Sequence, residues 1–323
     1  SVLPSGRYVT PAEKTIRITH DPFGLAISPD QKVAITMHEN AITIIDIATM
    51  QQKRIPEYYN KKESPLIKGS FMGVSFDTQK NLVYLSGGDE GSVIVYDYVN
   101  YKKVDSIYLD GLFNGVKYQG SFTSDLIYHA KKNELLILDR GNFRLVRYSL
   151  TQKKVTASIP TGRQPFGLAL SPDKKTVLVA NVGMYAYPLV EGTTKENIKT
   201  QYINWHPYGN NTKESIEGTE IDGKKIPGLG SPNVLEAMSV YCIDLATNKV
   251  AARLKTGMLL GELVEDAEVI GGASPNSIVV SSKYAYVTNA TNDNIAVIDY
   301  KKGRIVKHIP IKVDQRIDKL RGL

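Results

Sequence analysis

The chain has 323 residues, of which 42% are hydrophobic and 23% are charged, as is usual for a globular protein. No stretch of 18 apolar residues occurs, so the sequence predicts no transmembrane helix. The formal net charge is +7 and the pI is about 9.1. The lysines and arginines are scattered over predicted turns rather than gathered in one stripe, which makes nucleic-acid binding a minor interpretation.

The start of the chain shows no export signal, and its single cysteine excludes an intramolecular disulfide. Ser1–Thr15 lacks a basic segment followed by an apolar one, so no signal peptide is visible. A start at serine suggests that a preceding segment was removed, which favours a periplasmic or secreted protein and leaves a cytoplasmic one open. Cys242 alternates with polar neighbours on a predicted strand, so we expect it to pack in the core rather than to react.

The segment Asp21–Pro56 has the pattern of four short strands joined by tight turns. Its first strand is small and apolar, and its last is polar. Pro29-Asp30-Gln31-Lys32 and Ala48-Thr49-Met50-Gln51 have the residue types of tight turns. The predicted strands are Gly24–Ser28, Val33–Met37, Ala41–Ile47 and Gln52–Ile55. Four antiparallel strands in this order make one blade of a β-propeller, counted from the axis outward.

The same unit of about forty residues recurs along the chain. The second unit covers Phe71–Leu109, and the third, Leu126–Thr161, is the most degenerate. The fourth opens at Gln164 with QPFGLALSPDKK and resumes at Met238–Gly257, and the fifth covers Ser274–Ile311. Radial repetition of this kind predicts an all-β fold, a β-propeller of four-stranded antiparallel blades with five visible units.

An aspartate closes the third predicted strand in four of the five units. A carboxylate at this position can accept hydrogen bonds from backbone N–H groups of the following turn, so we interpret these residues as structural. The third unit has Ser149 nearby instead. The four residues are Asp46, Asp97, Asp244 and Asp299.

Three features together resemble the YVTN-type β-propellers of the YncE-like family. They are the PFGLAxSPD openings, the literal Tyr-Val-Thr-Asn at residues 286–289, and the third strands that end in Ile-Asp. A narrower resemblance lies in Lys224–Glu236, KKIPGLGSPNVLE, and continues through Thr256–Gly261 to Gly271–Ser277. This succession is similar to the propeller half of bacterial proteins that fuse such a propeller to an alkaline-phosphatase-like phosphoesterase.

The resemblance implies seven blades, whereas five units are visible. The sequence ends at Leu323, where the resemblance predicts another PFGL-type opening. We therefore expect residues 1–323 to form a single propeller domain that is incomplete at its C-terminal end. The resemblance also implies a downstream phosphoesterase domain as a partner.

Irregular length is concentrated on one face of the predicted propeller. The insertion at residues 183–237 joins the second and third strands of the fourth unit, and Thr256–Ala273 leads into the fifth. Loops of this length are often functional. Tyr185, Trp205 and His206 belong to the aromatic residues of the insertion, which we predict to fold over the mouth of the central channel. The alternative is that these rings pack the insertion against its own blade.

Polar residues at strand ends on the same face are the other candidates for a ligand site. Converging from several blades, they could bind an anion, a sugar or a metal ion. Asn and Asp also suit tight bends without any ligand, so turn chemistry is the alternative for each of them. They are His20, Asp21, Asn40, Asp139, Arg140, Arg163, Asn181 and Asn289.

The sequence contains no GxSxG, HExxH or P-loop motif, and its five histidines lack metal-ligand spacing. We therefore predict a non-catalytic module that binds a ligand or a protein, with no cofactor. The first alternative is a lactonase-like hydrolase in which mouth carboxylates and asparagines hold a divalent cation. The second alternative is a nucleic-acid binder.

Overall fold

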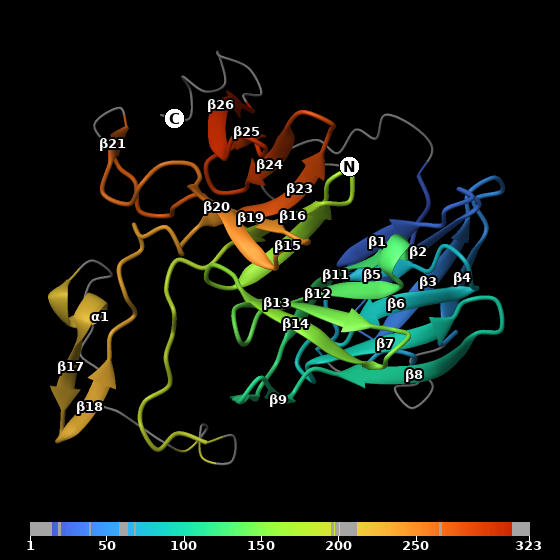
Figure 1. Cartoon of the computed structure of the whole chain (residues 1–323), viewed down its shortest axis with the longest axis horizontal. Coiled ribbons are helices and arrows are strands. Elements are labelled where there is room, and N and C mark those ends of the chain that lie inside the picture. Colours follow the sequence, from blue (N-terminus) through green and yellow to red (C-terminus); the bar gives the residue numbers. More distant parts are fainter. Residues whose placement is uncertain are drawn as a thin grey trace.

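A computed structural model gives the architecture, and Figure 1 shows it. Five four-stranded antiparallel sheets follow one another along the chain, and each has its strands in sequence order from first to last. This arrangement confirms the predicted all-β fold of propeller blades. Among the described residues, no helix is long and apolar enough to cross a membrane. The structure describes residues 15–18, 21–38, 40–57, 64–67, 69–194, 197, 200, 212–264 and 267–311.

The first three blades match the first three predicted units, and the strand ends of blade 1 lie within one residue of the predicted ones. The third blade also has a regular first strand, which the sequence did not reveal. Blade 1 contains β1 (Gly24–Ile27), β2 (Val33–His38), β3 (Ala41–Asp46) and β4 (Gln52–Ile55). Blade 2 contains β5 (Val74–Phe76), β6 (Leu82–Ser86), β7 (Ser92–Asp97) and β8 (Lys102–Tyr108). Blade 3 contains β11 (Thr123–His129), β12 (Glu134–Asp139), β13 (Arg144–Ser149) and β14 (Lys154–Pro160).

The last two blades match the fourth and fifth units. In blade 4, the insertion separates the second strand from the third, yet the two strands pair directly, with Asn181 opposite Ser239. Blade 4 contains β15 (Pro165–Leu170), β16 (Thr176–Asn181), β19 (Ser239–Asp244) and β20 (Lys249–Lys255). Blade 5 contains β23 (Pro275–Val280), β24 (Ala285–Asn289), β25 (Asn294–Asp299) and β26 (Arg304–Pro310).

Three small hairpins lie outside the blades. The hairpin of β9 (Gly111–Phe113) and β10 (Val116–Tyr118) connects blades 2 and 3, and β21 (Leu263–Val264) with β22 (Ala267–Glu268) precedes blade 5. The insertion carries α1 (Lys213–Glu217), β17 (Gly218–Ile221) and β18 (Lys224–Pro227). Figure 1 shows these three elements to the side of the blades, at the lower left, rather than over the inner strands.

The cores lie between neighbouring blades. The first strands β1, β5, β11, β15 and β23 contact one another in this order. Between blades 3 and 4, Leu136 and Leu138 pack with Leu168, Val177 and Ile243. The second and third strands of each inner blade are therefore buried on both faces, which explains why they are largely apolar rather than alternating. The fourth strands β8, β14 and β20 are more exposed and more polar.

The carboxylates that close the third strands are turn residues, as predicted. Asp46 accepts a hydrogen bond from the N–H of Thr49 (2.7 Å), and Asp244 accepts one from Thr247 (2.7 Å). Asp97 and Asp299 bind their turns in the same way. In blade 3, the hydroxyl of Ser149 accepts a bond from the N–H of Gln152 (3.1 Å). The third blade thus keeps the turn with a different side chain.

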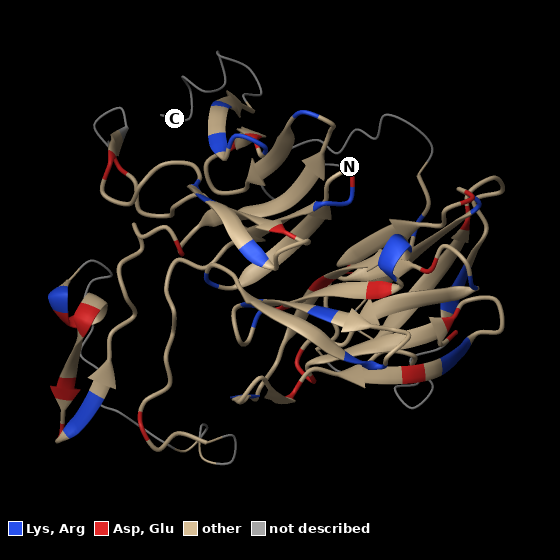
Figure 2. Ribbon diagram, in the orientation of Figure 1, with Lys and Arg blue, Asp and Glu red and all other residues tan. Residues whose placement is uncertain are grey.

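Charged side chains are spread over all blades. Figure 2 shows Lys and Arg interspersed with Asp and Glu, without a continuous stripe of either sign. Cys242 lies in the core between blades 4 and 5 and is fully buried. Burial raises the pKa of its thiol to about 12, which leaves it protonated and unreactive at neutral pH. This confirms the prediction that Cys242 packs in the core.

Candidate functional site

Four phenylalanines from four blades meet where the first strands begin, an end that we call the upper mouth. Each of them stands at or just before the start of its first strand: Phe23, Phe71, Phe122 and Phe166. The ring of Phe71 lies 5.5 Å from Phe122, 5.5 Å from Phe166 and 6.1 Å from Phe23, measured between centroids. Blade 5 has Asn276 at the corresponding position. The repeat therefore produces an aromatic floor at the upper mouth.

Arg140 lies over this floor. Its guanidinium carbon is 5.7 Å from the ring centroid of Phe122 and 6.0 Å from that of Phe166. Nη2 donates a hydrogen bond to Oε1 of Gln164 (2.6 Å). Burial lowers the pKa of the guanidinium, and no carboxylate pairs with it in the described part of the chain. A partly buried cation without a counter-ion is an attractive position for an anion.

A pocket of about 280 Å³ opens beside Arg140, with Phe122, Phe143, Gln164 and Tyr187 in its wall. Tyr187 comes from the base of the insertion and is 57% exposed. Its φ of 51° lies in the left-handed region, which is unusual for an aromatic residue. The pocket combines one cation with aromatic surface, which suits a small anion that carries an organic body.

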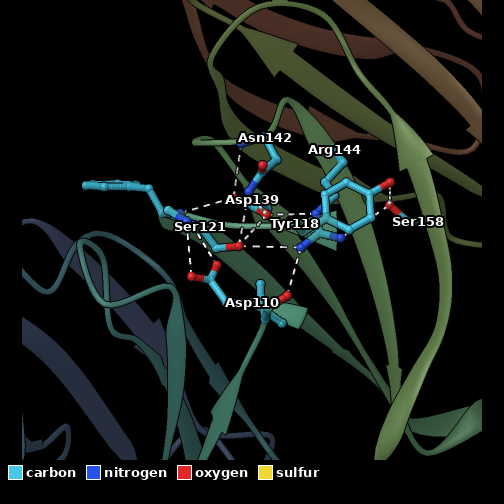
Figure 3. Close-up of polar contacts among 10 residues, drawn as sticks. Asp110, Tyr118, Ser121, Asp139, Asn142, Arg144 and Ser158 are labelled. Carbon is cyan, nitrogen blue, oxygen red and sulfur yellow. Dashed lines mark hydrogen bonds and ion pairs between the residues drawn. The ribbon is translucent and has the colours of Figure 1, made fainter. Parts of the chain in front are cut away.

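Asp139, a predicted site residue, lies inside blade 3 and has no exposed surface (Figure 3). Its carboxylate accepts hydrogen bonds from Nε of Arg144 (2.7 Å), the hydroxyl of Ser121 (2.8 Å) and Nδ2 of Asn142 (2.9 Å). It also accepts one from the N–H of Phe122 (3.0 Å). Asp139 therefore holds the backbone that carries Phe122 and Arg140, instead of facing the pocket.

Arg144 completes this buried network. Its guanidinium carbon lies 3.5 Å from the ring centroid of Tyr118 on β10, and Nη2 donates to the carbonyl of Leu109 (2.9 Å). Figure 3 shows the tyrosine ring stacked against the guanidinium. The β9–β10 hairpin thus covers an ion pair that a strand-end pattern does not predict.

Asn181 and Asn289 occupy the same repeat position as Asp139 and are buried as well. Nδ2 of Asn181 donates to the carbonyl of Ser239 (3.2 Å), and Nδ2 of Asn289 donates to Oδ1 of Asn294 (2.8 Å). Their Oδ1 atoms are buried without a hydrogen-bond partner among the described residues. Both asparagines lie within their blades rather than around the pocket.

The remaining predicted residues are distributed differently. Arg163 donates from Nη1 to the carbonyls of Met184 and Ser231 (both 2.8 Å), so it fixes the base of the insertion. Tyr185 is buried and packs edge-on against Tyr187. Asp21 has the left-handed backbone that Gln164 and Ser274 share, each directly before a proline, and this marks a repeated turn. His20, Trp205 and His206 lie outside the described residues.

The structure thus brings one predicted residue, Arg140, into the pocket and places the aromatic floor beneath it. Sequence reasoning did not single out the phenylalanines, although a Phe recurs close to the start of the first strand in four repeats. Within the described ranges, no group of three or more His, Cys, Asp or Glu is arranged to hold a metal ion. Asp139 is one of the two acidic ligands named for the lactonase alternative, beside Asp21, and its carboxylate is engaged by Ser121 and Arg144.

Asp125 is a further titratable group near the axis. It lies on β11, and its carboxylate accepts hydrogen bonds from the N–H groups of Leu126 (2.8 Å) and Leu168 (3.1 Å). Burial raises its pKa to about 6, and the two hydrogen bonds only partly oppose this. The folded state therefore binds more protons than the unfolded state between about pH 4 and pH 6, and Asp125 stabilises the fold less as the pH rises.

Asp125→Asn removes this titration. We expect the stability of the variant, relative to the parent, to rise by up to about 3 kcal/mol between pH 4 and pH 7, since one pKa unit corresponds to about 1.4 kcal/mol. Urea unfolding at several pH values measures the difference. Asp30→Asn is the control. The Ser28 hydroxyl lowers the pKa of Asp30, so the stability of this variant relative to the parent is expected to fall, not rise, with increasing pH. A difference that does not change with pH contradicts the assignment.

No protein-family model matches the chain, and no curated protein matches it. Solved structures with a similar fold do match the chain. Hydrazine synthase of Kuenenia stuttgartiensis aligns over 92% of this chain and 90% of its own, with 13% identity and a TM-score of 0.50. The structure of U3-55K aligns over 90% of this chain and 67% of its own, with 9% identity and a TM-score of 0.55. The structure of the RRP9 WD40 repeats aligns over 89% of this chain and 66% of its own, also with 9% identity and a TM-score of 0.55. At these identities the similarity establishes a β-propeller-like fold of four-stranded sheets.

Proposed function

We propose that this chain is a non-catalytic binding module that holds a small anionic ligand, such as a sugar phosphate, at its upper mouth. The observation that supports the proposal is Arg140, a partly buried guanidinium over two phenyl rings with no carboxylate partner among the described residues. Gln164 fixes the guanidinium from one side, and Tyr187 offers an exposed ring to the body of the ligand.

The wider setting of the module rests on its sequence. The YVTN-type openings and the KKIPGLGSPNVLE segment resemble the propeller half of exported bacterial phosphoesterase proteins. We propose a periplasmic or secreted location and an accessory role, in which the ligand at the upper mouth is presented to a phosphoesterase domain. Co-purification of the chain with that domain, expressed separately, tests this part independently of the ligand.

Arg140→Met is the direct test of the anion site. With glucose 6-phosphate as the probe, we expect the variant to bind at least about tenfold more weakly, because a charge-assisted hydrogen bond contributes about 1.5–3 kcal/mol. Glucose and inorganic phosphate serve as probes for the neutral body and for the anion alone. Isothermal titration calorimetry measures all three.

Arg253→Met is the matched control. Arg253 also lies over an aromatic ring, that of Tyr241 at 5.6 Å, but it is on β20, away from the pocket. We expect this variant to bind like the parent. If glucose 6-phosphate binds equally well to the Arg140 variant, or does not bind to the parent at all, the upper mouth is not a sugar-phosphate site.

A further inference from the structure

One residue of each blade lies where the first strand ends, and blade 3 differs from the others at this position. In the other blades it is Ser or Asp, and its side chain accepts a hydrogen bond from a backbone N–H group of the turn or of the first residue of the second strand. These residues are Ser28, Asp77, Ser171 and Ser281. Blade 3 has His129, followed by the 3-10 turn Ala130–Lys132. The repeat is therefore interrupted at this end of β11.

His129 belongs to a buried polar cluster that joins blades 3 and 4. Its Nδ1 lies 2.9 Å from Oε1 of Glu134, and the same carboxylate accepts bonds from Nε (3.0 Å) and Nη2 (2.8 Å) of Arg147. Nη1 of Arg147 reaches the carbonyl of Leu245 in blade 4 (2.7 Å). Nε2 of His129 is buried and has no hydrogen-bond partner in the described ranges. The cluster therefore connects the end of β11 to blade 4 through Arg147.

A pocket of about 590 Å³ opens beside this cluster, which we call the lower mouth. β11 runs from Thr123 to His129, so the upper and lower mouths lie at opposite ends of the same strand. The apolar part of the wall comes from Ile127, Leu168 and Leu170. Lys131 and Lys174 contribute the charges, and no Asp or Glu lines the pocket.

The nearby carboxylates do not neutralise these lysines. Asp77 accepts hydrogen bonds from the hydroxyl of Tyr84 (2.9 Å) and from the turn N–H of Gln79. Asp173 accepts bonds from the hydroxyl of Ser171 (2.6 Å) and from the N–H of Lys175. Both carboxylates are therefore engaged within their own blades. No ion pair of Lys131 or Lys174 is present among the residues that the structure describes.

We propose that the lower mouth is a second binding site, which takes a small monocarboxylate with an apolar body. The two ammonium groups hold the carboxylate, while Ile127 and Leu170 contact the body. The volume accommodates a chain of several carbons, and the apolar wall favours burial of that chain over a bare anion. The site is separate from the upper mouth and does not depend on Arg140.

Hexanoate is a suitable probe, with acetate and hexan-1-ol as the ligands that lack the body or the charge. We expect saturable binding of hexanoate to the full chain, with shifts of the Ile127 methyl signals in NMR spectra of 13C-methyl-labelled protein. Lys131→Gln with Lys174→Gln is expected to weaken binding about tenfold, by the loss of charge-assisted contacts. Both lysines are exposed, so the double variant is expected to fold, which circular dichroism verifies.

Lys153→Gln with Lys301→Gln is the matched control, because these exposed lysines lie in turns between third and fourth strands and do not line the pocket. We expect this control and Arg140→Met to bind hexanoate like the parent. The proposal is overturned if the parent shows no saturable binding, if acetate binds as tightly as hexanoate, or if the Lys131 and Lys174 variant keeps full affinity. Loss of binding in Arg140→Met would move the ligand to the upper mouth and likewise overturn it.

Discussion

Leu168→Ala is expected to lower the free energy of unfolding by about 3 kcal/mol, whereas Leu25→Ala lowers it by less than about 0.5 kcal/mol. The two leucines hold the same position in two PFGLA openings. Leu168 is 7% exposed and packs against Leu136 and Leu138 of the preceding blade. Leu25 is 63% exposed, because no blade precedes blade 1 among the described residues. The same substitution thus removes a core contact in one case and a surface side chain in the other.

Urea unfolding of the two variants under identical conditions measures the difference. Each serves as the control of the other, since residue type, strand position and repeat motif are shared. The result that contradicts the argument is an equal loss for both variants, which would mean that the outer face of blade 1 is covered in solution. Ile27 is 54% exposed on blade 1, and Val279 is 70% exposed on blade 5. Substitution of either residue by alanine extends the comparison to further exposed positions.

The pair Leu25 and Leu168 also shows what the sequence can predict. The repeat predicts the strands, their order and the blades, because every unit encodes the same turns and the same apolar positions. It cannot distinguish the two leucines, since their burial depends on a neighbouring blade rather than on local sequence. Blade 3 is the least recognisable unit in the sequence because no PFGL-type opening precedes its strands, although the structure forms a regular first strand there.

The candidate site was predicted only in part. Arg140 was identified from its position after a second strand, but Asp139 and Asn181 were grouped with it although their side chains are buried within the blades. Adjacent strand residues point to opposite sides, so strand-end position alone does not say which residue reaches the mouth. The pairing of Asp139 with Arg144 depends on the register of the turn between them. A sequence does not specify that register directly.

The described elements of the insertion do not lie over the channel mouth, where the insertion is predicted to fold. Its described elements α1, β17 and β18 lie beside the blades, while its base reaches the upper mouth through Tyr187. The hairpin has its own small core, with Ile221 and Ile226 buried. Length and aromatic content indicated a functional loop, but they do not fix the direction in which such a loop projects.

Arg144→Met is expected to lower the free energy of unfolding by about 3–5 kcal/mol, because it leaves the fully buried carboxylate of Asp139 without its cation. The substitution also removes the stacking on Tyr118 and the hydrogen bond to Leu109. Urea unfolding followed by circular dichroism measures the loss. Lys213→Gln is the control, since the ion pair of Lys213 with Glu217 is exposed and its removal is expected to stay within experimental error.

Asp139→Asn in the Arg144→Met background identifies the cause. The asparagine is neutral and keeps an oxygen that can accept the bond from the N–H of Phe122, so part of the lost stability should return. If the double variant is as unstable as the single one, lost packing rather than an uncompensated charge explains the effect. Asp139 holds the backbone that carries Arg140, and it loses its cation in the Arg144→Met variant. We therefore expect this variant to bind glucose 6-phosphate more weakly even where it remains folded. Such a result would link the buried network of blade 3 to the anion site proposed at the upper mouth.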